Sequence, residues 1–169
     1  QKILLETASD QIYRRSKQAI YWIYDLTSKE LEKVVDAKIQ EPLFSPDGTK
    51  IAYVYRRNLF VKELHNQNII QVTFDGDYKT INGITDWVYE EEFGFVRAFD
   101  WSPDSSELLY MRFDESNVPI FSMDIYGKDV YPFPYPFRYP KAGEENSEIT
   151  LYRFTLDTRK KDRIHFEGE

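Results

Sequence analysis

Residues 42–55 read PLFSPDGTKIAYVY, and this stretch predicts the fold. An aromatic strand end runs into a Ser-Pro-Asp-Gly turn at residues 45–48, where proline presets φ and the Asp-Gly pair closes a tight turn. An apolar and aromatic strand follows, so the stretch predicts a β-hairpin. Residues 99–111, FDWSPDSSELLYM, repeat the pattern with Trp101 in the place of Phe44. The chain therefore contains a weak internal repeat of hairpins.

Short runs of β-branched and aromatic residues predict further strands, over residues 19–26, 58–64, 69–74, 149–156 and 163–167. Repeated units of several short strands are typical of β-propeller blades. The chain holds about three such units, fewer than the four blades of the smallest complete propeller. We therefore expect an all-β fold, a partial β-propeller over residues 1–169 that forms an arc of a larger ring. Its terminal strands should be unpaired edges, which favour self-association.

The composition excludes several classes of function. The formal net charge of −7 argues against binding to a nucleic-acid backbone. The chain has no cysteine, which excludes disulfides and thiolate metal sites. No apolar run approaches the ~20 residues that cross a bilayer, and Gln1 begins no signal-peptide pattern. We expect no nucleic-acid partner, no membrane span in this segment, no metal and no other cofactor.

Residues 82–94, NGITDWVYEEEFG, interrupt the repeat. Thr85 or Asp86 can cap a short helix there, and Gly94 can end it. The three glutamates at positions 90–92 should then lie on a rigid inserted segment.

These three carboxylates permit several interpretations. They can form the solvated face of the helix, where acidic side chains meet the N-terminal dipole. A metal site is disfavoured because consecutive glutamates point in different directions and because His65 and His165 are isolated. A glycosidase pair needs two carboxylates about 5–10 Å apart across a sugar, which adjacency does not imply. Two neighbouring carboxylates can also bind an ammonium group, which donates three hydrogen bonds.

Residues 130–140, VYPFPYPFRYP, alternate proline with aromatic residues. Proline lacks the donor that a sheet ladder needs, so this segment cannot be a central strand. We expect a protruding arm over about residues 118–143, or a segment that covers a sheet edge. A loop packed on its own blade is the structural alternative.

Residues 82–92 resemble the glutamate-bearing segment of the dipeptidyl peptidase IV family of serine exopeptidases. The likeness covers nearly the whole chain and extends to residues 24–26, 101–103, 113–115, 118–119, 139–143 and 146. It implies an N-terminal eight-bladed propeller above an α/β-hydrolase domain that carries Ser, Asp and His, of which this chain resembles only the early-to-middle blades. The sequence contains no Gly-x-Ser-x-Gly elbow, so the hydrolase domain is absent from it and no catalytic residue is assigned.

The resemblance implies substrate-binding roles for three residues. Glu91 and Glu92 bind the free α-amino group of a peptide, so that only the bond two residues further on reaches the serine and X-Pro dipeptides are removed. Two like charges held close in a shielded cavity are strained until a cation arrives. Arg14 contacts the backbone carbonyl of the substrate, with Arg15 as the alternative if the alignment slips by one residue.

Partners and location are also implied by the resemblance. They are the N-terminus of a peptide substrate, the hydrolase domain of the same parent chain, and a second copy of the chain bound through the arm in a homodimer. The family works outside the cytoplasm, in the periplasm or at the surface of a bacterial cell. The alternative function is a noncatalytic propeller scaffold for protein–protein binding, and a parent gene that continues into Gly-x-Ser-x-Gly would favour the peptidase.

Overall fold

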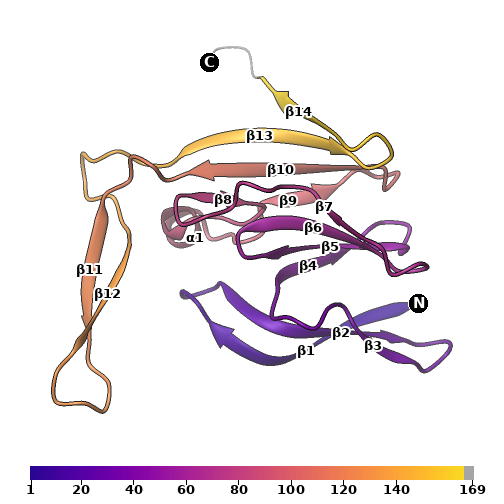
Figure 1. The fold of residues 1–169 in the computed structure, drawn as a ribbon, viewed down its shortest axis with the longest axis horizontal. Coiled ribbons are helices and arrows are strands. Elements are labelled where there is room, and N and C mark those ends of the chain that lie inside the picture. Colours follow the sequence, from indigo (N-terminus) through magenta and orange to yellow (C-terminus); the bar gives the residue numbers. More distant parts are fainter. Residues whose placement is uncertain (166–169) are drawn as a thin grey trace.

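A computed structural model describes residues 1–165, which form three antiparallel sheets side by side and a separate two-stranded ribbon (Figure 1). The first sheet contains β1 (Lys2–Gln11), β2 (Lys17–Asp25) and β3 (Leu31–Lys33). The second contains β4 (Gln40–Phe44), β5 (Lys50–Tyr55), β6 (Asn58–Glu63) and β7 (Ile69–Gln71). The third contains β8 (Thr80–Asn82), β9 (Phe99–Trp101), β10 (Glu107–Asp114), β13 (Glu148–Thr155) and β14 (Lys160–Ile164). The expectation of an all-β arc of about three blades is confirmed.

Both predicted hairpins form around their Ser-Pro-Asp turns. Phe44 of β4 pairs with Ile51 of β5, and Trp101 of β9 pairs with Leu108 of β10. Gly48 has φ 69°, in the left-handed region that glycine adopts without strain. The two turns also meet, because the amide of Asp47 donates to the hydroxyl of Ser105 at 3.1 Å. The repeat therefore places neighbouring sheets in contact at their turns.

The other predicted strands form with shifted ends. β2, β6 and β13 lie close to the predicted ranges, whereas β7 ends at Gln71 instead of residue 74. The strand ends early because the amide of Leu59 donates to the hydroxyl of Thr73 at 2.9 Å, so a side chain replaces the backbone acceptor. The strand predicted over residues 163–167 begins earlier, at Lys160, and residues 166–167 lie outside the described range.

The aromatic and proline-rich segment forms a ribbon of β11 (Ile120–Ile125) and β12 (Phe133–Arg138), which extends away from the sheets (Figure 1). Alternate N–H groups of a strand point to the same side. Pro134 and Pro136 therefore leave one side of β12 without donors, and β11 pairs along the other side. The proline spacing is compatible with a two-stranded ribbon but not with a central strand.

Two apolar clusters hold the sheets together. One lies between the first and second sheets and includes Ile23, Ile39 and Tyr53. The larger one lies between the second and third sheets and includes Leu59 and Phe113. Because the clusters join neighbouring sheets, each sheet depends on the next for burial of its apolar face.

Candidate functional site

The inserted segment contains the helix α1 (Trp87–Phe93). Asp86 is its N-cap, and its side chain accepts a hydrogen bond from the amide of Tyr89 at 2.9 Å. Gly94 ends the helix with φ 74°. The predicted short helix is confirmed, with Asp86 as the cap. Thr85 instead joins the two ends of the insertion, since its hydroxyl donates to the carbonyl of Phe95 at 3.0 Å.

Contacts from the arm and from the core anchor this helix. The ring of Trp87 lies 4.7 Å from that of Tyr139, at the base of the arm. The hydroxyl of Ser147 donates to the second carboxylate oxygen of Asp86 at 2.5 Å. On the other side, Tyr89 packs edge-on against Phe113 with ring centroids 5.2 Å apart. The helix is therefore held in one orientation at its first turn.

The three glutamates lie in three different environments. Glu90 is only 1% exposed, and its Oε1 accepts hydrogen bonds from the amides of Arg15 at 2.6 Å and Ser16 at 2.9 Å. Glu91 is partly buried, and its Oε2 lies 3.2 Å from Nε of Arg14. Glu92 is exposed. The interpretation of all three as a solvated face is wrong, because the turn between β1 and β2 covers Glu90 and supplies its hydrogen-bond donors.

The structure distinguishes the environments of the two adjacent arginines. Arg14 faces Glu91, and its own side chain is 74% exposed. The guanidinium of Arg15 lies beside Gly94, 3.8 Å from the position that a Cβ there would take. A cation at this place is favoured by the negative end of the helix dipole. The fold thus brings Arg14 together with Glu91, while Arg15 meets the end of the helix.

This arrangement differs from the expected pair of uncompensated carboxylates. Arg14 already offsets part of the charge of Glu91. Glu92 makes no hydrogen bond or ion pair within residues 1–165. Together the side chains of Arg14, Glu91 and Glu92 carry one net negative charge. The carboxylates of Glu91 and Glu92 can still accept hydrogen bonds from an ammonium group, because each carboxylate has about four lone-pair sites.

Glu115 is a buried carboxylate near this helix, within the family likeness at residues 113–115, to which the sequence assigned no role. Its Oε2 lies 3.1 Å from a guanidinium nitrogen of Arg57. Tyr13, Asp86 and Trp87 line the same cavity of about 110 Å³. Burial raises the pKa of Glu115 to about 7, the negative charge of Asp86 adds to the rise, and Arg57 and Arg138 oppose it. Glu115 therefore changes charge near neutral pH.

Replacement of Glu115 by glutamine should weaken the pH dependence of stability. Between about pH 4.5 and 7 the folded protein keeps a proton that the unfolded chain releases, so this group's stabilising contribution falls as pH rises, by up to about 3 kcal/mol. Glu115→Gln has no such proton. The free energy of unfolding of this full-length variant, measured by thermal unfolding, should therefore fall less than that of the wild type as pH rises through this window. Glu144→Gln, at an exposed position, is the control and should follow the wild type. An unchanged slope in Glu115→Gln would contradict this assignment.

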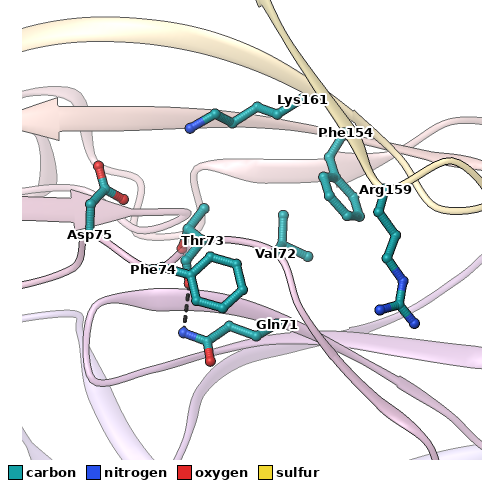
Figure 2. Close-up of a pocket in the computed structure, with 8 residues that line it drawn as sticks. All are labelled: Gln71, Val72, Thr73, Phe74, Asp75, Phe154, Arg159 and Lys161. Carbon is teal, nitrogen blue, oxygen red and sulfur yellow. Dashed lines mark hydrogen bonds between the residues drawn. The ribbon is translucent and has the colours of Figure 1, made fainter.

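A second cavity lies between the end of β7 and the hairpin of β13 and β14 (Figure 2). It has a volume of about 490 Å³ and is bordered by the rings of Phe74 and Phe154 and by the basic side chains of Arg159 and Lys161. The side-chain amide of Gln71 donates across its floor to the carbonyl of Thr73 at 2.8 Å. None of the predicted substrate-binding residues lines this cavity. It is a groove between neighbouring sheets, separate from the glutamate helix.

Residues 1–165 contain no group of three or more His, Cys, Asp or Glu side chains that could hold a metal ion. They also contain no helix with the length and apolar character of a membrane span.

Known proteins match this chain in sequence and in fold. The family model of the dipeptidyl peptidase IV (DPP IV) N-terminal region matches residues 1–168. The chain is 37% identical over 162 residues to human prolyl endopeptidase FAP and 37% identical over 163 residues to cat dipeptidyl peptidase 4. These alignments cover 94% and 93% of the chain, and 21% of each relative. The chain thus spans about a fifth of the length of these curated relatives.

A solved structure agrees with these matches. The crystal structure of Porphyromonas gingivalis dipeptidyl peptidase 4 superposes with a TM-score of 0.93 at 38% identity. The match covers 99% of this chain and 24% of that chain.

Proposed function

Because the chain belongs to the dipeptidyl peptidase IV family, we propose that it is the propeller segment that binds the free N-terminal amine of a peptide substrate. In this proposal Glu91 and Glu92 accept hydrogen bonds from the substrate ammonium, and Arg14 binds a backbone carbonyl next to it. The parent protein removes N-terminal dipeptides of X-Pro type, and the nucleophilic serine, the aspartate and the histidine belong to the part of the parent outside this chain.

One observation carries the proposal. Glu91, on a helix capped at both ends, lies 3.2 Å from Arg14, which lies in the turn between β1 and β2, and exposed Glu92 is next to Glu91 in the chain. Such a group pairs two acceptors for an ammonium with one donor for a carbonyl, which matches the polar groups of a peptide N-terminus. With the ammonium held, the distance to the serine selects the bond that is cut.

A pair of substrates tests the proposal in the full-length protein. A chromogenic dipeptide with a free amine should be cleaved with a kcat/KM roughly 1000-fold or more above that of its N-acetylated form. The acetyl group removes the charge and two donors, which leaves acceptor sites on partly buried Glu91 unpaired. Equal rates on the two substrates would contradict amine recognition. A parent protein that cleaves neither substrate would favour the scaffold function.

The arm is proposed as the contact with a second copy of the parent, which is expected to work outside the cytoplasm as a homodimer. The ribbon and its tip expose large apolar side chains, among them Ile120, Val130, Tyr131 and Phe133. Rigid aromatic residues bury area at little entropic cost, and exposed apolar clusters favour association.

A further inference from the structure

Glu90 joins the helix to the turn that carries Arg14. Its carboxylate is buried, and one oxygen, Oε1, accepts hydrogen bonds from two consecutive backbone amides, those of Arg15 and Ser16. The donors lie between β1 and β2 of the first sheet, whereas Glu90 lies in the insertion between β8 and β9 of the third sheet. Hydrogen bonds to a charged acceptor are among the stronger ones in proteins.

The turn itself is tied together through Ser16. The amide of Ile12 donates to the carbonyl of Ser16 at 2.9 Å, and the amide of Tyr13 donates to the hydroxyl of Ser16 at 3.2 Å. A group that fixes Ser16 therefore also fixes the backbone on either side of Arg14.

Neighbouring positions of α1 thus hold the same turn in different ways. Successive side chains of a helix are separated by about 100° around its axis. Glu90 points inward to the backbone of the turn, and Glu91 points to the side chain of Arg14. Because Arg14 is mostly exposed, its ion pair with Glu91 holds the turn only weakly by itself. The buried contacts of Glu90 are the stronger constraint.

We propose that Glu90 is a positioning residue for amine recognition: it sets the distance between Arg14 and Glu91 without touching the substrate. This inference rests on the proposed function of Glu91, Glu92 and Arg14. It adds that the first glutamate of the triplet acts on selectivity through the backbone of residues 15–16.

Kinetics of the full-length protein test this role. Glu90→Ala should lower kcat/KM for the free-amine dipeptide by about 10- to 100-fold, because two charge-assisted hydrogen bonds are lost. Glu90→Gln should lower kcat/KM less, by about 3- to 10-fold, because the side-chain oxygen of glutamine can still accept hydrogen bonds from the backbone amides of both residues. In an Arg14→Ala background, Glu90→Ala should cost no more than about 3-fold, since residues that act as a unit are not additive.

Lys62→Met is the matched control for loss of a buried charge. Buried Lys62 donates to the carbonyls of Lys33 at 3.3 Å and Val34 at 2.8 Å, so it also makes two charged hydrogen bonds to backbone, in a region away from α1. This variant should lose thermal stability with kcat/KM unchanged. Hydrogen exchange at the amides of Arg15 and Ser16 should become faster in Glu90→Ala and stay slow in Lys62→Met.

The outcomes separate the two proposals. Unchanged exchange at residues 15–16 in Glu90→Ala, or an equal cost of Glu90→Ala with and without Arg14, overturns the positioning role. If these results occur while Glu91→Gln is impaired, the amine site stands and only the role of Glu90 fails. If Glu91→Gln keeps wild-type activity, the proposed function fails, and the inference about Glu90 fails with it.

Discussion

Glu91→Gln in the full-length protein should lower kcat/KM for a free-amine dipeptide substrate by about 100-fold or more while the fold stays intact. Glutamine keeps the size of the side chain but removes the charge that faces Arg14 and that, in the proposed site, binds the substrate ammonium. The net charge of Arg14, Glu91 and Glu92 together then rises from −1 to 0. The substrate ammonium would then lie near the guanidinium of Arg14, which no longer has an ion-pair partner. Steady-state kinetics and circular dichroism measure the two parts of this prediction.

Two further variants define the specificity of that result. Glu92→Gln removes the exposed carboxylate and should also reduce kcat/KM by orders of magnitude. Asp36→Asn removes one negative charge from a side chain that is 88% exposed in the connection between β3 and β4, and it should act as wild type. Retained activity in Glu91→Gln, or an equal loss in Asp36→Asn, would show that the local arrangement has no special role.

Phe113→Ala should lower the free energy of unfolding by about 3–5 kcal/mol. Phe113 is 0% exposed in the cluster between the second and third sheets, so its removal leaves a cavity among packed neighbours. It also supports α1, because Tyr89 rests edge-on against its ring. Calorimetry of the full-length protein should therefore show a lower unfolding temperature for the propeller.

Phe74→Ala is the matched control for this loss. The side chain of Phe74 is 76% exposed, so the same deletion leaves no buried cavity and should change stability by less than about 0.5 kcal/mol. Equal destabilisation by the two variants would contradict the placement of the core between these sheets.

Features that depend on neighbouring residues were predictable from the sequence. The Ser-Pro-Asp turns form with bonds such as that from the amide of Thr49 to Asp47 at 3.0 Å. The caps Asp86 and Gly94 act within one helix of seven residues. In each case the interacting groups are a few residues apart, so residue type and spacing determine the geometry.

Features that depend on pairing partners were predicted less well. No pattern indicated β1 as a strand, because nine of its ten residues are exposed and it alternates weakly between apolar and polar types. Its place follows from the ladder with β2. No pattern indicated the partner of the proline-rich strand either, which is β11.

The sequence alone determined that this is an all-β arc of hairpins in the dipeptidyl peptidase IV family, with a capped helix that carries three glutamates. Only the tertiary structure decided that Glu90 is buried, that Arg14 meets Glu91, and that Glu92 faces solvent. The bond from Arg15 to Glu90 joins residues 75 positions apart. Its geometry depends on how the sheets pack against one another, which periodicity and spacing within a segment do not encode.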